Sequence, residues 1–211
     1  MSHWFDFDSL IMRFLGRVMD LVLLNLCFII GCIPIVTIGT SMTAMYSVSL
    51  KLVRNEEDYI FQSFWKNWKE NFKQSTLVWL LILTLGFLFW IEYHLIHSMP
   101  QGAFPYFLVF WSIMLVIFFL VVWNIFPYMA RYDDKVRICI LNSFKLAIRH
   151  VFYSIIALTA FSLLVILSLW NMVTVIWMLC FWLLIGFSFV MYINSLYMRR
   201  IFDRIEADRE I

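Results

Sequence analysis

Few side chains in this sequence could carry chemistry, and three of them lie close together. Glu92, His94 and His97 fall near the end of a long apolar run. On a helix, His94 and His97 are one turn apart, so both imidazoles could face one cation. The following short loop supplies no third strong ligand. We therefore expect these histidines to anchor the chain at a membrane–water boundary, with a metal or proton-sensing role as the alternative.

A second ionisable pair lies near the start of the first apolar run. Arg17 precedes Asp20 by three residues, close enough for an ion pair within one helix. A charge at membrane depth costs roughly 3 kcal/mol on insertion scales, so such residues suggest function by default. Here both side chains can pair and reach the nearby boundary. We expect a structural pair, with a functional role for Asp20 as the alternative.

The sequence carries no familiar catalytic signature. It contains no phosphate-binding glycine loop, no H-E-x-x-H and no nucleophile elbow. Serine and threonine are plentiful, but no histidine or carboxylate is placed to activate one. Deep amides at Asn25, Asn124 and Asn194 could bond between helices or line a substrate path. We predict no enzymatic activity and no cofactor.

The composition excludes a soluble globular protein. Of the 211 residues, 64% are hydrophobic and only 14% are charged. The four cysteines form no C-x-x-C pair, so we expect free thiols that act as small buried apolar groups.

The apolar runs predict an all-α, polytopic membrane helix bundle with about six transmembrane helices in a single domain, residues 1–211. A spanning helix needs about 20 apolar residues. The runs pair into three hairpins, at residues 17–53, 76–126 and 151–194. Three interfacial amphipathic helices are predicted before them, at residues 4–15, 59–73 and 137–150.

The basic residues give the arrangement an orientation. All sixteen Lys and Arg residues fall on one side of the six-span arrangement. The positive-inside rule makes that side cytoplasmic, so we predict that both termini are cytoplasmic.

The amphipathic segment at residues 59–73 combines aromatic and basic faces. Its apolar face includes Trp65, Trp68 and Phe72, and its other face carries Lys66, Lys69 and Lys73. A basic residue near an anionic membrane surface contributes about 1 kcal/mol of binding. We expect this segment to bind anionic headgroups of the lipid bilayer or to dock a partner. The continuous apolar face argues against nucleic acid.

The sequence from Ser63 is echoed from Ser143. S-F-W-K-N-W-K-E-N-F and S-F-K-L-A-I-R-H-V-F share their first two residues, a basic residue and a final phenylalanine. Either the chain repeats a unit, or two unrelated segments meet the same interface.

The stretch from Ile33 to Lys51 is predicted to organise the whole bundle. Pro34 and Gly39 bracket a turn, since proline removes a backbone donor and glycine relaxes the dihedral constraint. The arm that follows is rich in small residues, which let helices approach closely in lipid: Thr37, Gly39, Thr40, Ser41, Thr43, Ala44, Ser47 and Ser49. We predict that this arm faces protein on most sides.

The same stretch resembles the YesL-like family of bacterial integral membrane proteins. The likeness lies in P-I-V-T-I-G, T-A-M-Y and L-K-L, with matches at Pro34, Thr37, Ile38, Gly39, Thr43, Ala44, Tyr46 and Lys51. Met42 and Met45 depart from the pattern. The resemblance implies a multi-pass protein of the bacterial cell membrane, often encoded beside carbohydrate uptake systems. It implies no biochemical activity.

Two functions remain open at this point. The first is a membrane accessory or regulatory protein linked to carbohydrate uptake, with a carbohydrate transporter subunit or a second copy of the chain as partner. The alternative is a small transporter or channel, which the tandem hairpins and the polar second arm favour. Against the alternative, deep charges are few and only one broken helix is predicted, at Pro34.

Overall fold

The computed structural model describes residues 10–56, 59–97 and 104–207, and helices dominate these residues. The first half contains α1 (Leu10–Gly31), the short η2 (Ile35–Thr37), α2 (Ile38–Val53), α3 (Ile60–Glu70) and α4 (Phe72–His97). The second half contains α5 (Phe104–Arg131), α6 (Val136–Arg149), α7 (Val151–Ser168), α8 (Met172–Phe181), the π-helical η3 (Trp182–Gly186) and α9 (Phe187–Ala207). The predicted all-α class is confirmed.

Five helical segments in the described residues are long and apolar enough to cross a membrane. They cover Ile11–Gly31, Phe72–His97, Phe104–Arg131, Val151–Ser168 and Met172–Ala207. The sixth predicted span corresponds to α2, which has only 16 residues. Such a helix is about 24 Å long, against a hydrocarbon core of roughly 30 Å. Because α2 is surrounded by other helices, its length is set by protein neighbours and not by the bilayer.

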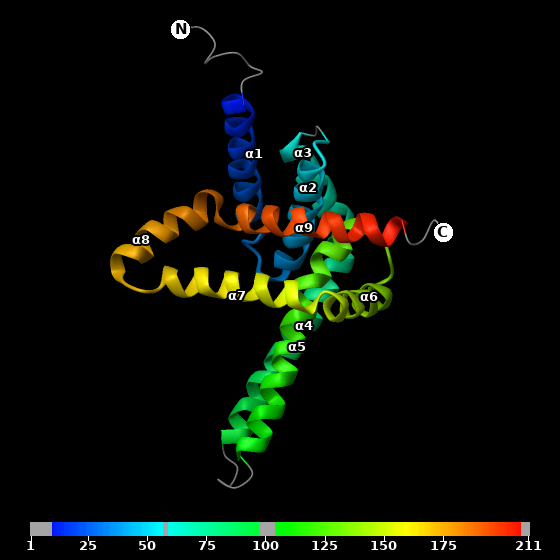
Figure 1. The fold of residues 1–211 in the computed structure, drawn as a ribbon, viewed down its shortest axis with the longest axis vertical. Coiled ribbons are helices and arrows are strands. Elements are labelled where there is room, and N and C mark those ends of the chain that lie inside the picture. Colours follow the sequence, from blue (N-terminus) through cyan, green and yellow to red (C-terminus); the bar gives the residue numbers. More distant parts are fainter. Residues whose placement is uncertain (1–9, 57–58, 98–103, 208–211) are drawn as a thin grey trace.

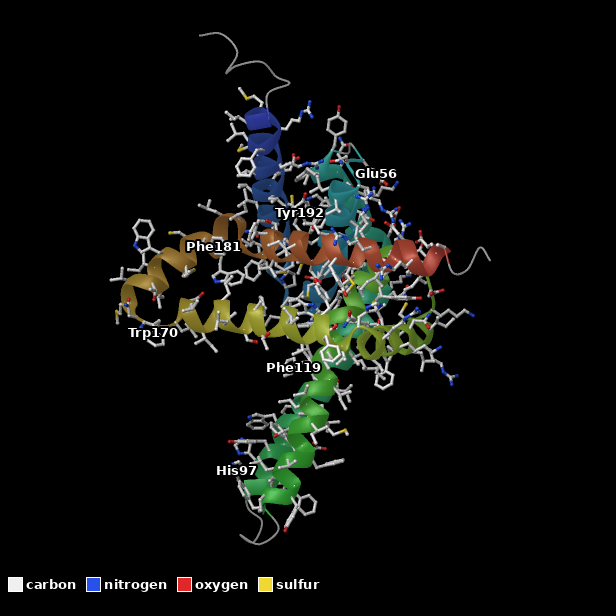
Figure 2. All side chains as sticks on the ribbon, viewed as in Figure 1. Glu56, His97, Phe119, Trp170, Phe181 and Tyr192 are labelled. Carbon is white, nitrogen blue, oxygen red and sulfur yellow. The ribbon has the colours of Figure 1, made fainter. Side chains whose placement is uncertain are left out.

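Five of the helices form two arms that extend away from α2 (Figure 1). α4 and α5 form one arm that extends away from the other helices, and α7 with α8 and α9 forms a second arm that runs across the first. Both arms carry apolar side chains on their outer surfaces, including Trp170 at the turn between α7 and α8 (Figure 2). One bilayer normal therefore cannot run along both arms.

The predicted centre of the fold is confirmed. Of the 16 residues of α2, 13 are buried, and the helix contacts α1, α3, α4, α5 and α9. Its small residues allow these close approaches. A Cβ atom on Gly39 would lie 2.5 Å from Trp79 Cβ and 2.9 Å from the Ser75 carbonyl oxygen, so α4 packs directly on the glycine.

The predicted turn after α1 is also present. The Thr37 hydroxyl donates to the carbonyl oxygens of Gly31 and Pro34, at 2.7 and 2.8 Å. Trp79 Nε1 reaches over from α4 and donates to the Ile35 carbonyl oxygen at 2.9 Å. The Pro34 and Ile35 carbonyl oxygens also accept the backbone N–H groups of Thr37 and Ile38, so these side-chain bonds reinforce the turn.

Several predicted boundaries are wrong. Residues 4–9 of the first predicted interfacial helix lie outside the described residues, and residues 10–15 are continuous with α1. α3 ends at Glu70, so Phe72 and Lys73 belong to α4. α5 continues through Pro127 to Arg131, since a proline near a helix end removes only one hydrogen bond there.

The charged C-terminal segment is helical and packs against the other helices. α9 continues to Ala207, and Met198, Ile201 and Phe202 are buried. The ring of Phe202 packs at 5.5 Å from that of Tyr132. The apolar residues recur at helical spacing among the charges, and burial of that face extends the helix.

The internal echo has a structural counterpart. Ser63 and Ser143 are both buried, Ser63 in the first turn of α3 and Ser143 in the middle of α6. Ser75 on α4 donates to Thr43 on α2 at 2.9 Å, and Asn124 on α5 donates to Ser154 on α7 at 3.0 Å. The first bond joins α4, the first helix of the second hairpin, to α2, the second helix of the first hairpin. The second bond joins α7, the first helix of the third hairpin, to α5, the second helix of the second hairpin. This shared pattern favours a true repeat.

All four cysteines are free thiols. Cys27 and Cys139 are buried as predicted, Cys32 is half-buried, and Cys180 is exposed, so the predicted burial is wrong for Cys180.

Candidate functional site

Asn25 on α1 holds the π-helical turn in place. Its side-chain nitrogen donates to the carbonyl oxygens of Trp182 and Leu183, at 3.0 and 2.8 Å. Its side-chain oxygen accepts from the Ser188 backbone N–H at 3.0 Å. A π turn disturbs the regular backbone ladder, and such turns occur often at functional sites. The amide supplies the partners that the disturbed ladder needs, so it locks η3 against α1.

Asn194 joins three helices at the centre of the fold. Its nitrogen donates to the Tyr46 hydroxyl of α2 at 2.8 Å, and its oxygen accepts from the Tyr153 hydroxyl of α7 at 2.9 Å. Tyr153 also stacks on Tyr197 with ring centroids 3.3 Å apart. Asn25, Asn124 and Asn194 therefore all form hydrogen bonds between helices. Of the two roles considered from the sequence, bonding between helices or lining a substrate path, the structure shows the first.

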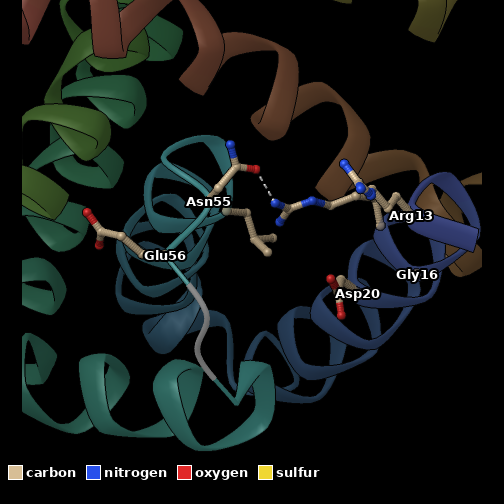
Figure 3. Close-up of a pocket in the computed structure, with 7 residues that line it drawn as sticks. Arg13, Gly16, Asp20, Asn55 and Glu56 are labelled. Carbon is tan, nitrogen blue, oxygen red and sulfur yellow. Dashed lines mark hydrogen bonds between the residues drawn. The ribbon is translucent and has the colours of Figure 1, made fainter. Parts of the chain in front are cut away.

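A polar pocket of about 380 Å³ separates the start of α1 from the end of α2 (Figure 3). It is lined by Arg13, Gly16, Arg17, Asp20, Leu52, Asn55 and Glu56. Arg17 donates across the pocket to the Asn55 side-chain oxygen, and its charge also interacts with Asp20, as the sequence predicts. The bond places the two ends of the hairpin side by side. Charges of both signs surround the pocket, so it does not single out one class of ion.

The aromatic face of α3 is turned toward protein and not toward lipid. Phe64 is fully buried, Trp65 and Trp68 are half-buried, and Trp68 Nε1 donates to the Ser41 hydroxyl at 3.2 Å. Phe72, at the start of α4, packs at 5.0 Å from Trp68. α1 and α2 therefore provide much of the apolar surface against which this face of the helix packs.

The basic face of the same region stays accessible. Lys66 and Lys69 on α3 and Lys73 on α4 are exposed. Lys51, which belongs to the hairpin motif, instead turns inward and donates to the Ser63 hydroxyl at 3.3 Å.

The histidines lie in an aromatic cluster at the far end of the α4–α5 arm, where Figure 2 marks His97. The His94 ring packs at 4.6 Å from Trp90, and the His97 ring at 4.3 Å from Tyr93. His97 Nδ1 is also 3.0 Å from the Tyr93 carbonyl oxygen. Within the described residues, no group of three His, Cys, Asp or Glu side chains, Glu92 included, could hold a metal ion.

Two titratable groups outside the long apolar helices are tuned by their surroundings. Burial, followed by the negative charge of Asp134, raises the pKa of Cys139 to about 11. Burial, with the charges of Arg149 and Arg204, lowers the pKa of His150. At neutral pH Cys139 is therefore a protonated thiol, which is a poor nucleophile.

A larger cavity of about 860 Å³ lies where the two arms diverge. Side chains of α2, α4, α5, α7 and α9 line it, and nearly all of them are apolar. Sequence reasoning did not find this cavity, the π turn or the partner of Asn25, since each depends on residues more than 100 positions apart.

These features define a polytopic helical protein of membrane type, with a buried central helix and polar bonds that fasten the surrounding helices to it. Residues 21–93 match the family model described as "Protein of unknown function, DUF624". The match spans the second half of α1 and all of α2 and α3, and it ends within α4. No curated protein and no solved structure gives a match.

Proposed function

We propose that this protein is a non-catalytic membrane accessory or regulatory protein that binds a partner at the cytoplasmic surface of a bacterial cell membrane. The resemblance to the YesL-like family suggests carbohydrate uptake as the process and a carbohydrate transporter subunit as the partner. The proposal extends the matched family model, which names no activity.

The use of the deep polar side chains carries this proposal. Asn25, Asn124 and Asn194 each bond to another helix, and Thr43 bonds to Ser75. A carbohydrate path needs polar groups that are free to exchange partners with hydroxyls. Polar groups that already bond to other helices favour a structural role over a carbohydrate-conducting path. The large cavity is lined mostly by apolar side chains and offers few polar groups to a carbohydrate.

The exposed lysines give the partner a place to bind. Lys66 and Lys69 lie on the same accessible face of α3, while the aromatic side of that helix anchors it to α1 and α2. A rigidly held helix with a basic face suits an acidic surface on a partner protein or the anionic headgroups beside it.

One observation favours the alternative of a small transporter or channel. The prediction of a single broken helix is wrong, because the π turn at Trp182–Gly186 interrupts the last long helix beside the first. Paired interruptions in apolar helices mark the binding sites of many transporters.

Co-purification in mild detergent tests the proposal. We expect a transporter subunit to be recovered in stoichiometric amount with the wild-type chain. Reversing Lys66 and Lys69 to glutamate should lower the recovery roughly tenfold or more, since each lysine near the surface contributes about 1 kcal/mol. Gln62→Ala, on an exposed side chain of the same helix, is the control and should leave recovery unchanged.

The opposite result would support the transporter. Solute flux by the pure protein in liposomes, with no protein recovered from the membrane alongside it, contradicts an accessory role.

A further inference from the structure

The outward side of α6 differs from that of α3, its counterpart in the internal echo. On α3 the exposed side chains are polar except Phe61, and they include Lys66 and Lys69. On α6 four large apolar side chains are 42–61% exposed: Ile138, Leu141, Phe144 and Ile148. Contact with water accounts for the outward side of α3 but not for that of α6.

Basic side chains lie among these apolar ones. Arg137 and Lys145 are exposed, and they lie about one helical turn before and after Leu141. Neither forms an ion pair with another residue that the structure describes. The sequence of α6 contains no acidic residue. A helix that mixes apolar and basic side chains on one side is typical of the membrane interface, where both kinds find partners.

The inward side of α6 is fixed, so the outward side cannot turn into the protein. Cys139, Ser143, Leu146 and Ala147 are buried, and the helix packs on α5. Asn142 Nδ2 donates to the Tyr128 hydroxyl of α5 at 2.7 Å, and that hydroxyl donates to the Asp134 carboxylate at 2.7 Å. These contacts leave the mixed side facing away from the bundle.

The position of α6 along α5 places it at headgroup level. Figure 1 shows α6 at the base of the α4–α5 arm, running crosswise to it. Tyr128, the partner of Asn142, lies about 36 Å along α5 from Phe104. The hydrocarbon core is roughly 30 Å thick, so a membrane that α5 spans has its headgroups at this level. A helix that crosses the end of a spanning helix there lies along the membrane surface.

We propose that the outward side of α6 is a binding surface for anionic phospholipid headgroups. Leu141, Phe144 and Ile148 enter the region below the headgroups, and Arg137 and Lys145 bind the phosphates around them. An anionic lipid suits the surface better than a zwitterionic one, since no acidic side chain of α6 is present to balance a lipid cation. The surface is separate from the basic face of α3, so it is independent of the proposed function.

Fluorescence quenching on the full chain in vesicles tests the position of α6. A fluorophore is attached to Leu141→Cys in a chain that also carries Cys180→Ser, because Cys180 is an exposed native thiol. We expect quenching by a lipid-borne quencher placed near the headgroup and little quenching by aqueous iodide. The same label on Gln62→Cys, in α3, should show the opposite pattern. If Leu141→Cys does not fold, Ile148→Cys carries the label on the same side of α6.

Two outcomes of the quenching experiment overturn the proposal. Quenching of the α6 label by iodide alone would mean that water covers this side of the helix. Protection of the label from both quenchers would mean that protein covers it, as in contact with a second copy of the chain.

Native mass spectrometry of the pure protein tests the requirement for charge. The protein is extracted in mild detergent from vesicles of phosphatidylglycerol and phosphatidylcholine, and we expect it to retain phosphatidylglycerol preferentially. Arg137→Gln with Lys145→Gln should lower that preference about tenfold, the combined effect of two basic residues near the surface. Arg137→Lys with Lys145→Arg keeps both charges and should keep the preference.

A wild-type chain that retains both lipids equally overturns the proposal, as does an equal preference in all three chains. Because the measurement uses no partner protein, either result leaves the proposed function unaffected.

Discussion

Replacing Gly39 with leucine should destabilise the protein by about 3 kcal/mol. A side chain at this position meets Trp79 Cβ at 2.5 Å and the Ser75 carbonyl oxygen at 2.9 Å, and a backbone atom cannot rotate away. Leucine is as compatible with a membrane as glycine, so insertion should continue while packing of α4 on α2 fails. The melting temperature in detergent should fall clearly.

Gly86→Leu provides the matched control. Gly86 also lies in a long apolar helix, but nothing lies within 4 Å of a Cβ atom built on it. The melting temperature of this variant should stay near that of the wild type. Equal losses from the two substitutions would mean that glycine is needed for insertion in general and not for the contact between α2 and α4.

Asn25→Leu should cost about 2–3 kcal/mol, the second largest effect that we expect. Leucine has a similar volume, but it leaves the Ser188 N–H without its acceptor and two carbonyl oxygens without a donor. Thermal unfolding in detergent measures the loss. The same substitution at Asn71 should be much milder, since among the residues that the structure describes the Asn71 amide bonds only to the Asn67 carbonyl oxygen, four residues earlier.

A particular outcome contradicts this account of the π turn. If Asn25→Leu melts at the same temperature as Asn71→Leu, the interrupted helix does not depend on α1, and Asn25 is not its fastening.

The sequence predicts what depends on neighbouring residues in the chain. The small side chains from Thr37 to Ser49 predict a helix enclosed by others, because small residues in a membrane helix allow neighbouring backbones to approach closely. Hydropathy predicts that the long helices exist, because each one appears in the sequence as a long run of apolar residues. Asn171 and Thr174 form a capping box at the predicted turn before α8.

The remainder depends on residues that only folding brings together. The apolar face of α3 has the same periodicity whether it meets lipid or protein, and only the position of Ser41 beneath Trp68 decides between them. Hydropathy also carries no information on the angle between two apolar arms, which side-chain packing determines. The large apolar cavity is likewise lined by side chains from five helices that only folding brings together.

Carbene labelling of the unmodified protein in membranes tests most directly whether α2 is the enclosed centre of the fold. A hydrophobic diazirine reagent dissolves in the bilayer and inserts into whatever side chains the lipid touches. Label should concentrate on α8, where Met172 is 86% and Trp177 is 73% exposed. The peptide from residues 38–50 should remain unlabelled. All of its residues are buried except Ile38 and Met42, which are half-buried. Labelling of that peptide to the same extent as α8 would contradict the account.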